Sequence, residues 1–209
     1  EVRNLLQNPQ LNVNWQNIFG QTPFCIACRY GYIEIVELLL NNDRVDFNKT
    51  NKHDETPFYI SCYYGHIEII KLLLNDERID FNKGDNDNNT PFSIACQQGH
   101  IEIVKLLLND KRVDTNGLPP FLMACVLGKI EEVKLLLNDE RIEINQVLNH
   151  GQTPFYIACQ FGHIEIVRLL LNDERIDINK PNKDDQTPFY IACENGHIEI
   201  VKLLLNDER

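Results

Sequence analysis

The tripeptide Thr-Pro-Phe recurs along the 209-residue chain, and its spacing constrains the fold more than any other feature. The copies start at Thr22, Thr56, Thr90, Thr153 and Thr187. Neighbouring copies lie 34 residues apart, except across the long gap after Thr90, where Pro119 begins a degenerate copy. A fixed period in this range is typical of stacked repeats, in which each unit buries its apolar faces only against its neighbours. The spacing therefore predicts a solenoid and not a conventional globule.

One unit, taken from Thr56, carries the signals of two short helices. Thr56 is suited to cap a first helix over roughly Pro57–Tyr64, with proline in the first turn. Gly65 can take the left-handed conformation in which helices often end. The apolar run that follows predicts a second helix to about Asn75, packed between two neighbours. The polar segment leading to the next threonine predicts a hairpin-like loop, which we call a finger. The fold class is therefore an all-α solenoid.

These motifs resemble those of ankyrin repeats. The family pattern Thr-Pro-Leu-His-x-Ala returns as Thr22-Pro23-Phe24-Cys25-Ile26-Ala27, and the family's Gly-His before the second helix returns as Gly65-His66. The motif histidine itself is replaced, by Cys25, Tyr59, Ser93, Leu122, Tyr156 and Tyr190. The resemblance implies one elongated, curved ankyrin-repeat domain over residues 1–209. Its expected parts are a partial repeat 1–21 and the repeats 22–55, 56–89, 90–118, 119–152, 153–186 and 187–209.

Both ends of the chain follow the internal pattern. Residues 1–6 align with the latter part of a second helix, and the last apolar run, 198–205, matches the internal ones. Terminal repeats normally carry a polar outer face. We therefore expect the segment to be part of a longer array, and its uncapped terminal repeats to support end-to-end self-association.

Six of the seven cysteines occupy the same position in successive repeats: Cys28, Cys62, Cys96, Cys125, Cys159 and Cys193. Stacked helices lie about 8–10 Å apart, whereas a disulfide needs Cα atoms within about 7 Å. We interpret these cysteines as small buried residues. Cys25-x-x-Cys28 resembles a redox or zinc half-site, but no second pair accompanies it. Unpaired buried thiols indicate a reducing compartment, which predicts a cytoplasmic protein, with the nucleus as an alternative.

The sequence predicts neither catalysis nor a bound metal or cofactor. The ladder of His66, His100, His163 and His197 follows the repeat period, which separates the rings too widely for a shared zinc ion at about 2.0–2.1 Å. No catalytic triad, phosphate loop or carboxylate pair stands out against the repeats. The net charge of −11 disfavours nucleic-acid partners. No apolar stretch approaches the about 18 residues of a membrane span, so no membrane insertion is expected.

Variation between repeats points to a binding surface. The family's concave surface uses the two residues before Gly-His together with the fingers, and the resemblance implies a protein or peptide partner there. Carried over, these residues are Arg29, Tyr30, Tyr63, Tyr64, Gln97, Gln98, Val126, Leu127, Gln160, Phe161, Glu194 and Asn195. Trp15 in the first finger is a further candidate, whereas Ile18 and Phe19 are expected to fold back on the adjacent helix. The structural alternative is that all these residues cover their neighbours.

The finger before the fourth repeat, Asp114–Pro119, has lost about half its length and the capping threonine. We expect the helix over Phe121–Leu127 to survive on its packing. We hypothesise that the shortened finger opens the groove beside Leu118, Val126 and Leu127 for an apolar side chain of the partner. The alternative is a tolerated loop deletion. For the whole chain, the leading interpretation is a non-catalytic interaction scaffold, and the alternative is an architectural or elastic spacer.

Overall fold

The computed structural model describes residues 10–115, 119–148 and 150–207. These residues form twelve α-helices and no strand. The chain divides into two compact units, residues 1–118 (unit 1) and 119–209 (unit 2). The division falls at the expected boundary between the third and fourth repeats, while the expected single domain stays a prediction.

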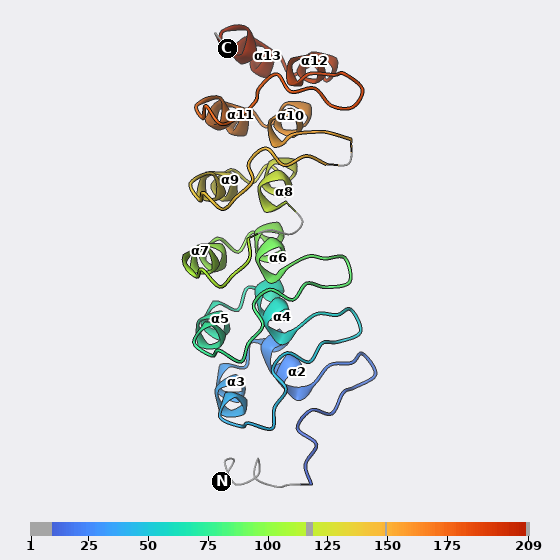
Figure 1. Ribbon diagram of the computed structural model, residues 1–209, viewed down its shortest axis with the longest axis vertical. Coiled ribbons are helices and arrows are strands. Elements are labelled where there is room, and N and C mark those ends of the chain that lie inside the picture. Colours follow the sequence, from blue (N-terminus) through green and yellow to red (C-terminus); the bar gives the residue numbers. More distant parts are fainter. Residues whose placement is uncertain (1–9, 116–118, 149, 208–209) are drawn as a thin grey trace. The chain divides into compact units, whose positions relative to one another are not determined.

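Each repeat is a pair of antiparallel helices, and within each unit a finger leads from one pair to the next (Figure 1). Unit 1 contains α2 (Pro23–Tyr30), α3 (Ile33–Leu40), α4 (Pro57–Tyr64), α5 (Ile67–Leu74), α6 (Pro91–Gln98) and α7 (Ile101–Asn109). Unit 2 contains α8 (Pro120–Val126), α9 (Ile130–Leu137), α10 (Pro154–Gln160), α11 (Ile164–Leu171), α12 (Pro188–Glu194) and α13 (Ile198–Leu205). Within each unit the first helices form one layer, the second helices form another, and the fingers project from the first layer (Figure 1).

The predicted caps are confirmed. The Thr56 side chain accepts a hydrogen bond from the Tyr59 backbone N–H at 3.1 Å, and the other Thr-Pro-Phe threonines cap their helices in the same way. Pro119 offers no side-chain acceptor, yet α8 forms, because most of its side chains are buried. The expectation that this helix survives without its cap is confirmed, with bounds shifted by one residue from those predicted.

Phenylalanine and leucine build the core between the two helix layers. The phenylalanine of the Thr-Pro-Phe motif is buried in every internal repeat, as the 1 % exposure of Phe58 illustrates. Leu73 and Leu107 of the second helices are fully buried. Burying such a side chain stabilises the fold by about 1.5–3 kcal/mol. Within each unit, the repeats are therefore held mainly by contacts with their neighbours.

Asparagine and arginine at fixed repeat positions add hydrogen bonds between neighbouring repeats. The Asn48 side chain donates to the Arg78 backbone carbonyl at 2.7 Å and accepts from the Asp80 backbone N–H at 2.7 Å. The Arg78 guanidinium donates to the Leu40 carbonyl at 2.7 Å and pairs with Asp76 at 2.6 Å. The hydrogen bond from Arg78 lowers the pKa of Asp76. Equivalent bonds are made by Asn14, Asn82, Asn145, Arg112 and Arg175.

The histidine ladder also links repeats, through a contact with a backbone carbonyl that was not predicted from the sequence. His66 lies at the start of α5 as predicted, and its Nε2 lies 2.8 Å from the Arg29 carbonyl of the preceding repeat. His100, His163 and His197 make the same contact with the repeat before them. An inter-repeat imidazole network therefore exists, although the histidine of the family's Thr-Pro-Leu-His motif is replaced. The fourth repeat carries Lys129 at this position.

The last described repeat corrects one expectation about the cysteines. Cys193 is exposed, whereas the other six cysteines are buried. Phe189 and Tyr190 beside it are 39 % and 49 % exposed, while Phe155 and Tyr156 of the preceding repeat are 1 % exposed each. The reason is that α12 packs over α10, and no described helix packs over α12 from the other side. Self-association through this face stays a prediction, and residues 1–6 lie outside the described part of the chain.

Candidate functional site

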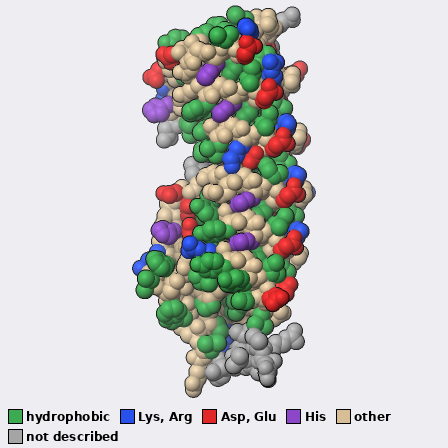
Figure 2. Space-filling view, turned by 180° about the vertical axis from the view of Figure 1, so that it is seen from behind, with side chains coloured by type: hydrophobic (Ala, Val, Ile, Leu, Met, Phe, Trp, Pro, Cys, Tyr) green, Lys and Arg blue, Asp and Glu red, His purple; other side chains and the backbone are tan. Residues whose placement is uncertain are grey.

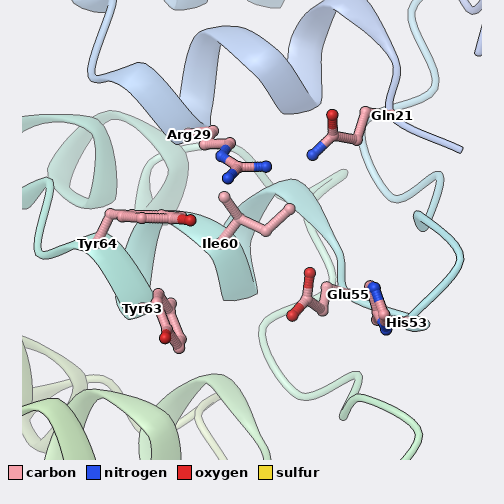
Figure 3. Close-up of a pocket in the computed structure, with 7 residues that line it drawn as sticks. All are labelled: Gln21, Arg29, His53, Glu55, Ile60, Tyr63 and Tyr64. Atoms are coloured by element: carbon pink, nitrogen blue, oxygen red, sulfur yellow. The ribbon is translucent and has the colours of Figure 1, made fainter. Parts of the chain in front are cut away.

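A hollow of about 250 Å³ lies between α2 and α4 of unit 1. It is lined by Gln21, Arg29, His53, Glu55, Ile60, Tyr63 and Tyr64 (Figure 3). Three of these residues, Arg29, Tyr63 and Tyr64, are predicted site residues, and the structure brings them together. They occupy the last turns of neighbouring first helices, just before the glycines that end those helices. The repeat geometry therefore places the variable positions side by side.

The Arg29 guanidinium is held by aromatic rings. Its central carbon lies 5.5 Å from the Tyr64 ring centroid and 5.9 Å from the Tyr30 ring centroid. Tyr63 and Tyr64 contact each other edge to face at 5.0 Å, and Tyr64 stacks on His66 at 6.2 Å. Cation–π contacts of this kind fix the direction of a guanidinium without using its hydrogen-bond donors. Within the described residues, no carboxylate pairs with Arg29.

The finger side of the hollow carries the opposite charge. Glu55 accepts a hydrogen bond from the Asn51 side chain at 2.5 Å. Its position is held by an amide in four other repeats, as Gln21, Asn89, Gln152 and Gln186. Glu55 was not predicted from the sequence, although its break in the series of amides is a signal that the sequence carries. The hollow thus has a cation on its helix side and an anion on its finger side, as Figure 3 shows.

The first finger corrects a second expectation. Ile18 is 78 % exposed and Phe19 is 59 % exposed, so neither folds back on the adjacent helix. The turn sets their direction: the Asn17 side chain accepts from the backbone N–H groups of Phe19 and Gln21, at 2.9 and 3.0 Å. Trp15, the candidate contact, is 61 % exposed. Three large apolar side chains therefore lie on the outside of a single finger.

The remaining predicted residues divide between the two units. In unit 1, the half-buried Gln97 donates to the Asn89 side chain at 3.1 Å, and Gln98 is exposed. In unit 2, Leu127 and Phe161 are 48 % and 51 % exposed, and Phe161 stacks on His163 at 6.0 Å. Val126 and Gln160 are half-buried, and Glu194 and Asn195 are exposed.

Leu118 lies outside the described residues, as do residues 116 and 117. The hypothesis that the shortened finger opens a groove beside Leu118, Val126 and Leu127 therefore stays a prediction, as does its alternative of a tolerated loop deletion.

The two sides of unit 1 differ in character. Charged pairs line the second helices, where Glu68–Lys71 and Glu102–Lys105 each form an ion pair at 2.7 Å. In the lower half of Figure 2, acidic and basic side chains follow one edge, and hydrophobic side chains gather away from that edge. Exposed i, i+3 pairs contribute little to binding or stability. The exposed aromatic side chains Trp15, Tyr30 and Tyr64 lie on the side formed by the first helices and the fingers.

The chemistry of the cysteine pair is not that of a redox site. Cys25 and Cys28 are both fully buried, and burial raises the pKa of Cys25 to about 11 and that of Cys28 to about 12. A thiol with a raised pKa is a poor nucleophile and a poor metal ligand. Among the described residues, no cluster of three or more metal-ligating side chains occurs. No described helix is long and apolar enough to cross a membrane.

We expect only one thiol of the folded protein to react quickly with a colorimetric thiol reagent at neutral pH. Cys193 is exposed, whereas the other six cysteines are buried. Burial excludes the reagent and holds Cys25 and Cys28 in the protonated form. Cys193→Ser is expected to remove the fast phase, and Cys159→Ser is the matched control that keeps it. A second fast equivalent in the native protein would show that an internal repeat opens.

Comparisons with known proteins agree with the architecture. A family model described as ankyrin repeats (three copies) matches residues 1–85, 44–117, 77–147 and 121–209. Among solved structures, the ankyrin repeat domain of Bcl-3, described as a unique member of the IkappaB protein family, is similar. It superposes with a TM-score of 0.83 at 22 % identity, over 96 % of this chain and 90 % of that one. No curated protein sequence matches the chain. The chain consists of repeated helix pairs, and the family model matches it over its whole length. The chain therefore belongs to the ankyrin repeat family.

Proposed function

We propose that the chain is a non-catalytic scaffold that binds a protein or peptide on the face made by its first helices and fingers. Ankyrin repeat domains typically act as protein interaction modules, which supports the class of function. The observation that carries the proposal is the exposure of Trp15, Tyr30 and Tyr64 on this face. Tyrosine, tryptophan and arginine dominate the binding energy of protein interfaces. No disulfide joins the buried cysteines of the described chain, which supports a reducing compartment, and we propose a cytoplasmic location with the nucleus as the alternative.

The alternative function, an architectural or elastic spacer, is supported less well. A spacer needs only the contacts between repeats, and these are made by buried apolar residues and by the asparagine, arginine and histidine ladders. Exposed Trp15, Ile18 and Phe19 add nothing to those contacts, and large apolar groups in water favour aggregation. The other fingers show that polar residues serve equally well at these positions. A binding role explains the exception.

Replacing Tyr63 and Tyr64 by alanine is expected to reduce capture of the partner by at least about tenfold, the effect of losing one hot-spot residue. The measurement is affinity capture from the source cell with the immobilised chain, quantified protein by protein against the unaltered chain. Both side chains are 39–43 % exposed, so the fold should tolerate their loss. Thermal unfolding of each variant checks this.

The matched control is Glu68→Ala/Glu102→Ala, on the second-helix side. Both glutamates form exposed ion pairs that contribute little, so the control should capture the same proteins as the unaltered chain. If the tyrosine variant keeps every specific protein, or if the control loses them instead, the first-helix and finger face is not where the chain binds.

A further inference from the structure

The apolar first finger and the hollow of unit 1 form one continuous surface. The Phe19 carbonyl accepts a hydrogen bond from the Lys52 backbone N–H at 3.1 Å, which places Phe19 beside the tip of the second finger. The next residue of that tip, His53, lines the hollow. At the base of the first finger, the Asn17 side chain donates to Gln21 at 3.1 Å, and Gln21 lines the hollow too. A bound peptide segment can therefore contact the first finger and the hollow at the same time.

The first finger differs from the other fingers at each of its three outward positions. Where it has Trp15, the second, third and sixth repeats are preceded by Lys49, Lys83 and Lys180. Where it has Ile18, the aligned residues are Lys52, Asn86, Asn149 and Lys183. Where it has Phe19, they are His53, Asp87, His150 and Asp184. The fold accepts polar residues at all three positions, so folding does not explain why Trp15, Ile18 and Phe19 are apolar.

Arg29 is the cation of this surface and decides which charge a bound segment must carry. Its guanidinium is fixed by the Tyr30 and Tyr64 rings, points into the hollow, and has no carboxylate partner among the described residues (Figure 3). A guanidinium fixed in this way recognises a carboxylate through paired N–H donors. The chain carries a net charge of −11, so an acidic segment is repelled at long range and attracted only where a cation is presented. The attraction must therefore be local to Arg29.

We propose that the surface formed by Trp15, Ile18, Phe19, Arg29 and Tyr64 binds a peptide segment in which an acidic residue neighbours a large apolar one. The carboxylate pairs with the Arg29 guanidinium in the hollow, and the apolar side chain packs on the first finger. Glu55, on the finger side of the hollow, repels a misplaced carboxylate and so fixes the direction of the segment. This inference rests on the proposed function and names the chemistry of the partner.

The test is selection of random peptides displayed on phage against the immobilised 209-residue chain. Enriched peptides are expected to carry Asp or Glu next to Trp, Phe, Leu or Ile. Synthetic copies are then measured by fluorescence anisotropy against three variants. Arg29→Gln, which removes the cation, is expected to weaken binding at least about tenfold, and Arg168→Gln on α11 is the matched control without effect. Trp15→Lys/Ile18→Lys/Phe19→Asp, which copies the finger of the sixth repeat, should weaken it similarly.

Glu55→Gln separates recognition from a merely structural role of Arg29. The variant restores the amide of four other repeats, so the fold is kept, and removal of the opposing charge should strengthen binding of acidic peptides several-fold. A structural Arg29 gives no reason for such a gain. Enrichment of basic peptides, the absence of any enrichment, or acidic peptides indifferent to Arg29→Gln would overturn the inference. If partner capture still depends on Tyr63 and Tyr64 in that case, the proposed function stands while this inference fails.

Discussion

Gly65→Ala is expected to lower the free energy of unfolding by about 2–4 kcal/mol, although it adds a single methyl group. Gly65 ends α4 with φ +77°, a conformation that costs an alanine about 1–2 kcal/mol. An added Cβ would also lie 2.6 Å from Cε1 of the His100 ring. The ring would have to move and weaken its 2.9 Å contact with the Tyr63 carbonyl. Urea-induced unfolding followed by circular dichroism measures the loss.

Gly196→Ala is the matched control, because Gly196 has nearly the same φ, +72°, but an added Cβ meets no atom within 4 Å. The control therefore carries only the backbone cost, and the difference between the two variants reports the histidine contact. In the His100→Ala background the overlap is absent, so adding Gly65→Ala there should cost only the backbone contribution. Equal losses for Gly65→Ala and Gly196→Ala would mean that the His100 ring moves aside freely and does not hold the repeats together.

The helices could be predicted from the sequence because their signals are local. Thr56 and Gly65 lie at the two ends of α4, and each acts on backbone groups within a few residues. The uncapped α8 was also predictable, because burial of its apolar side chains outweighs a missing cap worth about 1 kcal/mol. Fold and repeat boundaries follow from such signals together with the period.

The contacts between repeats were missed because their partners lie 30–38 residues apart in the sequence. Asn48 looks like a turn residue when taken alone, and Arg78 looks like a solvated charge. The signal for both was their recurrence at one repeat position, which marks a residue that makes the same contact in several described repeats. When the repeats of the chain are aligned with one another, residues that recur at a position connect neighbouring repeats. Residues that differ from the other repeats indicate the candidate site.

For the candidate site, variation between repeats predicted Arg29, Tyr63 and Tyr64, which line one hollow, but the prediction for Ile18 and Phe19 in the first finger was wrong. Large apolar residues are usually buried, and this tendency led to the wrong expectation for Ile18 and Phe19. The structure shows that the Asn17 turn decides their direction. Glu55 was missed because it lies outside the two residues before Gly-His. A comparison of every finger position across the repeats would have identified the exposed apolar pair Ile18 and Phe19 as well as Glu55.

Glu132→Ile is expected to raise the free energy of unfolding by about 1–4 kcal/mol, the gain found when a buried charge is replaced by a packed apolar residue. Glu132 in α9 is only 6 % exposed, and its nearest cation, Lys129, lies 3.9 Å away. The same position is isoleucine in other repeats, where Ile103 and Ile166 are 2 % and 1 % exposed. Because the same position buries isoleucine in those repeats, we expect the surroundings of residue 132 to accommodate isoleucine as well. Urea-induced unfolding again provides the measurement.

The reverse substitution, Ile103→Glu, is the matched control, since it places the same carboxylate at the same position without Lys129. Its destabilisation should exceed about 3 kcal/mol, because a buried charge without a partner keeps its full desolvation penalty. The fourth repeat differs from its neighbours at both positions of the pair, with Lys129 for histidine and Glu132 for isoleucine. If Glu132→Ile instead lowers stability, the carboxylate forms hydrogen bonds that packing cannot replace, and the Lys129–Glu132 pair stabilises the fourth repeat itself.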